Sequence, residues 1–480
     1  MPRGRAAKLT RCVLLVRQPN TYPAERSYAL DVVLGEFLGL TWEISPEART
    51  DVEITLPELS APGTITIADC LFATPEHQWL TGESMPIRPL ARWDLDGTSI
   101  APTLVTSDLP IIYGTRLAGG TYYEEAADEI KLGVDIFGSV FFQLARYEEI
   151  VCPSRDAYDR FPAGATLAHG EGFLTRPLAN EYVEVLWAAM ARLWPRLNRR
   201  KRVFKESLSH DVDSPLYPTT SPPRVLKAAL GDITRRRDHR LALARLRTLR
   251  DQPRGDHVGD PYNTFEFIMD LSEGQGLRSA FYFIAGTTNP SRDGTYSLDD
   301  PWIGRLIRRI HERGHEVGLH PSYESFRDPA TIRSEHEALL QTCAQLGVGP
   351  QSVVGGRQHF LRWENPVTWR AWEQAGLAYD SSLGFPDDVG FRCGVCLDYP
   401  VFDLLARRPL RLVERPLVVM EKALFGERTT FDQDGLETIE QLRDRCKLFG
   451  GNFTLLWHNS RLASRRERRL YAAALRGKTA

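Results

Sequence analysis

The chain has 480 residues, of which 42% are hydrophobic and 25% are charged. This composition is ordinary for a globular protein with a large buried core, and it excludes intrinsic disorder, collagen and a disulfide-stapled miniprotein. Sixty Lys and Arg nearly balance 62 Asp and Glu, for a formal charge of −2, which argues against a dedicated nucleic-acid binder. At roughly 150 residues per domain, the length predicts two to four domains.

The cysteines and the N-terminus predict a cytoplasmic protein. Seven cysteines are an odd number and are widely spread, which is typical of reduced thiols in an intracellular chain. The N-terminus carries Arg3, Arg5 and Lys8, but the apolar run from Cys12 to Val16 is too short for a signal-peptide core. No stretch reaches the apolar length that spans a bilayer. Val13–Val16 is therefore expected to be a buried first strand.

The first 200 residues are predicted to form a mixed α/β accessory domain. Apolar residues at helical spacing indicate helices over 27–39, from Ile136 to Tyr147, and from about Glu181 to a stop at Pro195. Short β-like stretches lie between the first two helices, at 64–67 and 109–113. This part contains no group of residues that points to a chemistry.

A basic, polar segment at 196–202 marks the expected boundary between an accessory domain, 1–200, and a second domain, 201–480. A basic helical insertion follows at about 220–258 and includes Arg235–Arg237. Two interpretations of the insertion stay open. It is either a solvated helical hairpin or a dock for an anionic substrate or a membrane surface.

From about residue 263 onward, helices that end at glycine are each followed at once by a short strand. The strands are expected at 280–284, 315–320, 352–354, 377–379 and 453–457. The last helix is expected to carry Ile439, Leu442 and Leu448. This alternation is typical of repeated β/α units, and it predicts a barrel of parallel strands.

Residues able to do chemistry stand where the predicted strands end. They are Asp211 and Asp213, His320, Arg357, Asp380 and His458. The carboxyl ends of parallel strands in a barrel face one mouth, where active sites are built. Five strand ends that each supply a titratable or metal-binding group are hard to explain by packing.

The types of residue indicate metal-assisted hydrolysis. Asp211 and Asp213 are two residues apart, so on a straight strand both point to the same face. Crowded carboxylates raise one another's pKa unless a cation lies between them, so one Asp is expected to coordinate a metal ion while the other acts as base. His320 could be a neutral imidazole ligand, and His458 could protonate the leaving group.

Five short motifs, in this order along the chain, carry a family resemblance. They are Ser209–Asp213 (SHDVD), Gly314–His320 (GHEVGLH), Arg357–Phe360 (RQHF), Tyr379–Asp380 (YD) and Leu456–His458 (LWH). Over about 203–460 the chain resembles the polysaccharide deacetylase family, also called the NodB-homology or carbohydrate esterase family 4 domain. The resemblance implies a distorted (β/α) barrel that uses a divalent metal ion, zinc in the first instance.

The resemblance also implies a role for each matched residue. Asp211 would be the base and His458 the general acid, and Arg357 and Asp380 would position them. Asp213 and His320 would be metal ligands. The backbone N–H of Phe360 would bind the oxyanion, and Leu456 would line the acetyl pocket. The family's second metal histidine falls where this chain has Glu324, which is taken as the third ligand. His359 is a second candidate, and weak or lost metal binding is a third possibility. The prolines of the family's third motif are absent.

The resemblance predicts a hydrolase of non-peptide carbon–nitrogen bonds. It would remove an acyl group, N-acetyl in the first instance, from an amino sugar during surface-polysaccharide assembly for the cell envelope. The sugar is expected to be linked to a nucleotide or a lipid, whose phosphates suit the basic insertion. Two rivals stay open: hydrolysis of a cyclic amide or imide, and a silent scaffold that binds a glycan or a partner enzyme. Asp135–Phe142 (DIFGSVFF) resembles the accessory domain of bacterial deacetylase-like proteins from surface-polysaccharide loci.

Overall fold

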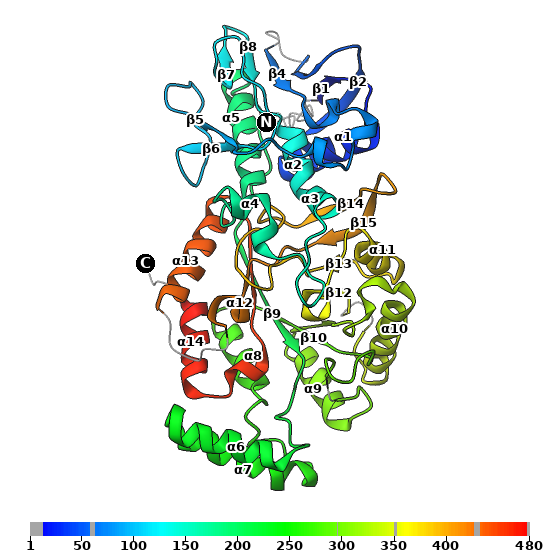
Figure 1. The fold of residues 1–480 in the computed structure, drawn as a ribbon, viewed down its shortest axis with the longest axis vertical. Helices are drawn as coiled ribbons and strands as arrows, with labels where there is room; N and C mark the ends of the chain where they lie inside the picture. Colours follow the sequence, from blue (N-terminus) through cyan, green and yellow to red (C-terminus); the bar gives the residue numbers. More distant parts are fainter. Residues whose placement is uncertain (1–12, 58–62, 295, 350–352, 427–432, 478–480) are drawn as a thin grey trace, which may run out of the picture. The chain divides into compact units, whose positions relative to one another are not determined.

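The computed structural model describes residues 13–57, 63–294, 296–349, 353–426 and 433–477. The chain forms two compact units (Figure 1). The first comprises Met1–Cys152, Pro177–Arg202 and Leu404–Pro409, and the second comprises Pro153–Arg176, Val203–Asp403 and Leu410–Ala480. Residues 153–176 precede the boundary expected from the sequence, yet they pack within the second unit.

The first unit is built on a six-stranded sheet in the order β2-β1-β3-β4-β8-β7. Its strands are β1 (Val13–Gln18), β2 (Thr41–Pro46), β3 (Asp51–Thr55), β4 (Thr64–Ala68), β7 (Tyr123–Glu125) and β8 (Glu129–Leu132). A separate pair, β5 (Ala91–Asp94) and β6 (Asp108–Ile111), forms a small second sheet. Its main helices are α1 (Pro23–Leu30), α2 (Ile136–Leu144), α3 (Tyr147–Val151) and α5 (Leu178–Leu193).

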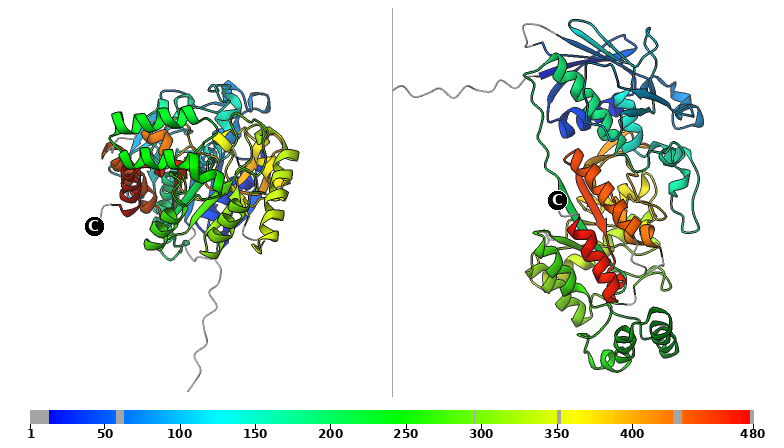
Figure 2. Two further views of the ribbon diagram at one scale, coloured as in Figure 1. Left: turned by 90° about the horizontal axis from the view of Figure 1, so that it is seen from below. Right: turned by 90° about the vertical axis from the view of Figure 1, so that its left-hand side faces the viewer.

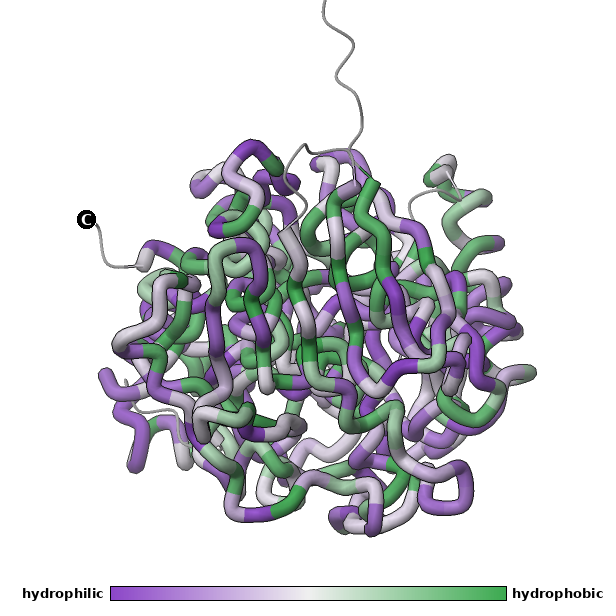
Figure 3. Tube along the Cα trace, turned by 90° about the horizontal axis from the view of Figure 1, so that it is seen from above, coloured by the Kyte–Doolittle hydropathy of each residue, from purple (hydrophilic) through white to green (hydrophobic). Residues whose placement is uncertain are grey.

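Side-chain alternation explains why these segments form half-buried strands. In β4, Ile65 and Ile67 are fully buried while their neighbours are partly exposed. Hydrophobic and hydrophilic residues alternate along extended strands in Figure 3. The mixed α/β character predicted from the sequence is confirmed, with parallel pairs (β1–β2, β4–β8) and antiparallel pairs (β1–β3, β3–β4, β7–β8) in one sheet.

The second unit contains a nine-stranded sheet in the order β14-β15-β13-β12-β11-β10-β9-β17-β16. The strands are β9 (Lys205–Val212), β10 (Ser279–Phe283), β11 (Glu316–Leu319), β12 (Gly355–Gly356), β13 (Tyr379–Asp380), β14 (Tyr399–Asp403), β15 (Arg408–Glu414), β16 (Val419–Met420) and β17 (Asn452–Leu456). From β15 to β16, neighbours pair in parallel. Among the described residues the order begins at β14 and ends at β16, so the hydrogen-bonded ladder is open rather than a closed barrel.

Helices alternate with these strands, as the sequence predicts. They are α8 (Phe265–Gly274), α9 (Pro301–Glu312), α10 (Pro329–Gln345), α11 (Val367–Gln374), α12 (Glu421–Phe425), α13 (Gln433–Leu448) and α14 (Arg465–Arg476). The expectation that the helix with Ile439 is the last one is wrong, because α14 follows it. Ser464 and Glu467 form a reciprocal capping box at the start of α14, a signal present in the sequence.

The basic segment after β9 forms two helices, α6 (Pro222–Gly231) and α7 (His239–Asp251), joined by a π-helical turn at Asp232–Arg236. The two helices lie side by side in Figure 1. This hairpin belongs to the connection between β9 and α8. It therefore leaves the sheet at the carboxyl end of β9, where Asp211 lies.

A glycine pair allows the close approach of β12 to its neighbours. A Cβ atom on Gly356 would lie 1.8 Å from the carbonyl oxygen of Leu319, and one on Gly355 would lie 2.2 Å from the ring of Tyr379. Both positions therefore require the absence of a side chain. Because Arg357 follows directly, this packing fixes the depth at which its side chain enters the site.

We predict that Gly356→Ala lowers the free energy of unfolding by about 3 kcal/mol, because the new methyl group meets backbone that has no room to move. Urea denaturation measures the change. Gly274→Ala is the matched control, since nothing lies within 4 Å of that position. It should change stability by about 1 kcal/mol or less. Equal stability of the two variants would contradict the close packing of β12.

Candidate active site

The carboxyl ends of three strands bring four of the predicted residues together. Asp211 lies in β9, Asp213 follows it, and His320 and His458 follow β11 and β17. The Nε2 atom of His320 lies 3.8 Å from Asp211 Oδ2 and 3.2 Å from Asp213 Oδ1. The Nε2 atom of His458 lies 3.5 Å from Asp213 Oδ2. These four side chains therefore lie close together at the carboxyl ends of the strands.

Three side chains at these strand ends could hold a metal ion. One donor atom from each of Asp213, His320 and His359 lies within 4.8 Å of the others. The Glu324 carboxylate, favoured from the sequence as third ligand, is half-exposed and accepts a 2.7 Å hydrogen bond from Arg362 Nη1. The structure thus brings His359, the second candidate, into the cluster and places Glu324 outside it.

A backbone carbonyl and a carboxylate orient the two imidazoles toward Asp213. His320 Nδ1 lies 2.6 Å from the Arg357 carbonyl, which only accepts, so Nδ1 carries the proton and Nε2 is left as the lone-pair donor. His359 Nδ1 lies 3.4 Å from Asp293 Oδ1, and its Nε2 lies 3.8 Å from Asp213 Oδ1. Both rings therefore present Nε2 to the same carboxylate.

The donor set fits a divalent cation. Asp213 Oδ1 is buried and has no hydrogen-bond partner among the described residues, although two imidazole nitrogens lie near it. Burial raises the pKa of Asp213, but the nearby His458, His320, His359 and Lys422 outweigh burial and hold the pKa well below its ordinary value. A carboxylate and two neutral imidazoles are ligands that zinc accepts, and they leave coordination positions open.

Arg357 holds Asp211 on one side of this cluster. The guanidinium is fully buried; Nη1 donates to Asp211 Oδ1 at 2.9 Å, and Nε donates to the Ser381 carbonyl at 2.9 Å. Burial raises the pKa of Asp211, but Arg357 and His320 outweigh it, so the pKa lies below its ordinary value. Asp211 is therefore an ionised, oriented carboxylate beside the candidate metal site.

Asp380 lies behind this arginine. Its Oδ1 accepts hydrogen bonds from the Ser382 backbone N–H and hydroxyl, while Arg357 Nη2 donates to Ser381 Oγ at 3.1 Å. Burial raises the pKa of Asp380 to about 7, and burial and Asp380 together raise that of Glu414, its partner across β13 and β15. Asp380, at the end of β13, thus supports the Ser381–Ser382 segment that holds Arg357, and among the described residues it makes no hydrogen bond with His458.

Glu421 orients His458, and sequence reasoning missed it. Its Oε1 lies 2.6 Å from His458 Nδ1, which turns Nε2 toward Asp213. Burial raises the pKa of Glu421, but His458 and Lys422 outweigh it, so the carboxyl is ionised. A signal was available, because Glu421 directly follows the short strand β16 and is one more acidic residue at a strand end.

An apolar cluster lies next to His458 in the chain. Leu456 is fully buried at the end of β17 and packs in a cluster of buried side chains: Leu361, Leu417 and Met420. Nearby, Phe360 has φ 60° and ψ 10°, in the left-handed region, and its carbonyl accepts a hydrogen bond from Arg160 Nη1 at 3.1 Å. The turn that carries the expected oxyanion N–H is therefore fixed by a residue from 153–176.

Aromatic rings form a rim next to His359. The ring of Phe360 lies 4.8 Å from that of His359, 5.5 Å from Tyr158 and 5.1 Å from Tyr323. The Arg292 guanidinium lies over the rings of Tyr158, Tyr323 and Phe360, at 5.0, 5.8 and 5.9 Å from their centroids. Tyr158 again comes from 153–176.

His210 and two cysteines, which could also bind a metal ion by residue type, lie outside this cluster. His210 Nδ1 donates to the Trp457 carbonyl at 2.6 Å, its Nε2 lies 3.2 Å from Ser279 Oγ, and burial lowers its pKa to about 4. It points away from the cluster. Cys393 and Cys396 are buried and form no disulfide.

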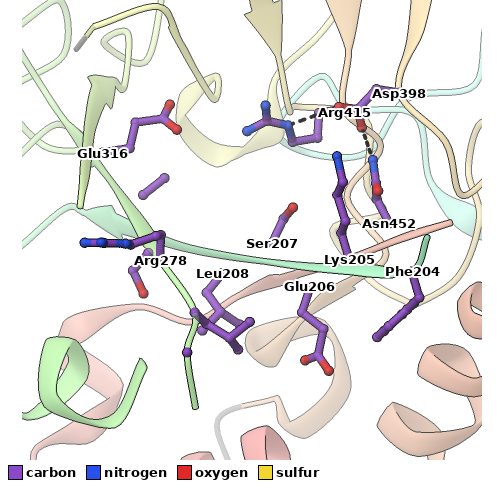
Figure 4. A pocket seen from close by; sticks show the side chains of 14 residues that line it. Phe204, Lys205, Glu206, Ser207, Leu208, Arg278, Glu316, Asp398, Arg415 and Asn452 are labelled. Carbon is purple, nitrogen blue, oxygen red and sulfur yellow. Dashed lines mark hydrogen bonds and ion pairs between the residues drawn. The ribbon is translucent and has the colours of Figure 1, made fainter. Parts of the chain in front are cut away.

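A separate cavity of about 580 Å³ lies at the opposite ends of the strands (Figure 4). Lys205, Glu316 and Asn452 line it where β9, β11 and β17 begin. Asp398 accepts a 2.8 Å hydrogen bond from Asn452 and lies 3.5 Å from Arg415. Its lining contains none of the residues expected to be catalytic.

Known proteins give limited guidance. A family model described as a family of unknown function, DUF7033, matches residues 14–195. No curated protein matches the sequence. A protein from Mycobacterium smegmatis, described as a candidate polysaccharide deacetylase, shares 17% identity and a TM-score of 0.36, with 58% of this chain and 84% of that one covered. A family 4 carbohydrate esterase from Streptomyces lividans, solved with acetate, shares 13% identity and a TM-score of 0.26, with 58% and 91% covered. TM-scores below 0.5 leave the function to be inferred from the site itself.

We predict that Asp213→Ala, His320→Ala and His359→Ala each weaken zinc binding at least 100-fold, because each removes a donor atom from the cluster. Isothermal titration calorimetry of the metal-free protein measures the affinity. Glu324→Ala is the matched control and should bind as the unsubstituted chain does. Loss of binding in Glu324→Ala with retention in His359→Ala would instead restore Glu324 as the ligand.

Proposed function

We propose that this protein is a metal-dependent hydrolase that removes an acyl group, N-acetyl in the first instance, from an amino sugar. The observation that carries the proposal is one arrangement of side chains. Asp213 and two imidazoles form a candidate metal site, flanked by an arginine-held carboxylate, Asp211, and a carboxylate-held imidazole, His458. A base and an acid on either side of a cation are the parts that amide hydrolysis needs.

Asp213, His320 and His359 would hold the metal ion. When bound, such an ion polarises the substrate carbonyl and makes water more acidic. Asp211 is ionised and fixed by Arg357, so it can accept the proton of an attacking water. Lowering the pKa of this base weakens it, but it also keeps the base free of a proton near neutral pH.

His458 would donate a proton to the leaving nitrogen. Its Nδ1 is committed to Glu421, so the proton transferred is the one at Nε2, the atom that faces Asp213. Glu421 then stabilises the charged imidazole before transfer, as a buried carboxylate does in other acid–base pairs. Asp211 and His458 thus act from opposite sides of Asp213.

The surroundings of the cluster suit an acylated sugar. Leu456 and its apolar neighbours could receive the methyl group of an acetyl moiety. The Phe360 backbone N–H lies in the turn fixed by Arg160 and would stabilise the developing oxyanion. The rings of Tyr158 and Tyr323 at the rim offer apolar faces of the kind that sugar rings contact.

The cellular setting is part of the same proposal. The five motifs and the resemblance of the first domain support a role in surface-polysaccharide assembly for the cell envelope. Six cysteines in the described part of the chain form no disulfide, which supports a reducing compartment such as the cytoplasm. The substrate would then be a nucleotide-linked or lipid-linked sugar rather than a finished polymer.

We predict that the zinc-loaded protein releases acetate from N-acetylated amino sugars, and that Asp211→Asn lowers kcat at least 1,000-fold, because the base is lost while the zinc site remains. Enzymatic detection of acetate measures kcat, and elemental analysis measures the zinc content. Asp444→Asn, at a side chain that is 67% exposed, is the control and should retain full activity. Acetate release that survives in Asp211→Asn would contradict the assigned base.

The same assay separates the rival functions. Turnover of a cyclic imide such as hydantoin, without acetate release from sugars, would favour hydrolysis of cyclic amides. A protein that binds neither zinc nor any hydrolysable substrate would be a scaffold.

We predict that Glu421→Gln lowers kcat about 10- to 100-fold with little change in KM, because His458 loses the carboxylate that orients it. Steady-state kinetics measure the change. In the His458→Ala background the same substitution should cost nothing further, since the two residues act as one unit. Additive losses would mean that Glu421 acts on the site by another route.

A further inference from the structure

The hairpin formed by α6, the π-helical turn and α7 exposes an unusual amount of hydrophobic surface. Of the ten large hydrophobic side chains exposed among the described residues, five lie between Leu226 and Val258. Leu226, Leu230 and Ile233 are 56%, 60% and 41% exposed. Their spacings of four and three residues put them on one helical face. No described element of the second unit covers this apolar stripe, which is why the three side chains are exposed.

The second helix adds a basic face. Arg240, Leu243, Arg247 and Arg250 follow one another at spacings of three, four and three residues, and all four are exposed. The residues that α6 and α7 bury are different ones: Val225, Ala229, Leu241 and Ala242. The hairpin thus has its own small core, and its exposed apolar side chains are surplus to that core.

The charge of the hairpin is strongly positive. From Arg224 to Arg254 the sequence has ten Lys or Arg and three Asp or Glu, a net charge of +7 in a chain whose total is −2. The acidic groups are used inside the hairpin. Asp232 is fully buried and pairs with Arg236 and Arg245 at 2.6 Å each, and Asp238 accepts the Leu241 backbone N–H at 2.9 Å. Asp251, the third acidic residue, pairs with Arg250 at 2.7 Å. Three acidic groups cannot balance ten basic ones, so the hairpin keeps its excess of positive charge.

Contacts near the two ends of the hairpin attach it to the rest of the second unit. The Arg245 guanidinium lies 4.4 Å from the ring centre of Tyr217, whose backbone N–H donates to Asp260 Oδ1 at 2.9 Å. Gln252 Nε2 donates to Asp260 Oδ2 at 2.7 Å. Because the hairpin connects β9 to α8, it rises from the same strand end as Asp211 and Asp213.

We propose that this hairpin docks on an anionic lipid bilayer. Exposed leucines and an isoleucine flanked by arginines are the pattern of an interfacial amphipathic helix, in which the apolar side chains enter the acyl boundary and the basic ones meet the headgroups. A solvated hairpin would have no reason to expose this stripe, and a surface for nucleic acid would need the charge alone. No described helix is long and apolar enough to cross a membrane, so the contact is one of surface docking.

A consequence for the substrate follows, and it rests on the proposed function. A hairpin that binds the membrane from the carboxyl end of β9 brings the metal site toward the bilayer surface. Of the nucleotide-linked and lipid-linked alternatives, docking favours an amino sugar carried on a lipid phosphate.

Co-sedimentation with vesicles tests the docking without any activity assay. We expect the full-length protein to bind vesicles of phosphatidylglycerol and phosphatidylcholine, and to bind pure phosphatidylcholine at least tenfold more weakly. Arg235→Gln/Arg237→Gln/Arg240→Gln should reduce the partition constant about 100-fold, because each basic residue near an anionic surface contributes about fivefold. Leu226→Ser/Leu230→Ser should reduce it at least tenfold by removing apolar insertion.

Matched variants elsewhere in the second unit serve as controls. Arg305→Gln/Arg411→Gln and Leu448→Ser alter exposed residues outside the hairpin and should leave vesicle binding unchanged. Circular dichroism confirms that each variant is folded. Absence of binding to anionic vesicles, equal binding by the hairpin variants, or retention on duplex DNA in place of vesicles would each overturn the docking proposal. Acetate release from a soluble sugar is read separately, so the hydrolase proposal can fail or stand independently.

Discussion

Two carboxylates enter one buried space at the end of β9, and the rest of the second unit is arranged around them. Asp211 lies in the strand and Asp213 directly beyond its end, where burial alone would raise the pKa of both carboxyls. Arg357 compensates the first, and the imidazoles of His320, His359 and His458 surround the second. Removing a single partner would leave an uncompensated buried charge, which is the costly case for ion pairs in a protein interior. The buried groups of the cluster thus compensate one another's charge, and a divalent cation would complete this compensation.

Much of this arrangement could be predicted from the sequence, because strand ends are local features. Alternating glycine-ended helices and short strands fixed the order of elements, and polar residues after each strand indicated the mouth. The choice between Glu324 and His359 could not be made this way. It depends on Arg362, which draws the Glu324 carboxylate away, and on the left-handed turn at Phe360 and Leu361, which brings His359 inward. Both are contacts between distant segments, and residue spacing does not encode them.

Glu421 and Asp380 also show what residue spacing leaves undetermined. The family pattern indicated Asp380 as a positioning residue, and in the structure it supports the Ser381–Ser382 segment that holds Arg357. Glu421 follows a strand of only two residues, which is too short to give a periodic signal, yet it holds His458 directly. Short strands are defined by their neighbours in the sheet rather than by their own composition, so the residues that follow them are the ones most easily missed. The apolar stripe of the hairpin is the reverse case. The sequence shows its spacing, but only the structure shows that the described residues leave it exposed.

The path of the chain between the two units has a further meaning. It passes from one unit to the other after residues 152, 176, 202, 403 and 409, so neither unit is a continuous stretch of sequence. Tyr158 and Arg160 reach the rim of the candidate site from an excursion that begins and ends in the first unit. The two halves are therefore interlaced, and they would have to be inherited, synthesised and folded together. A fragment that begins near residue 200 would contain most of the second unit, but it would lack Tyr158 and Arg160 at the rim of the candidate site.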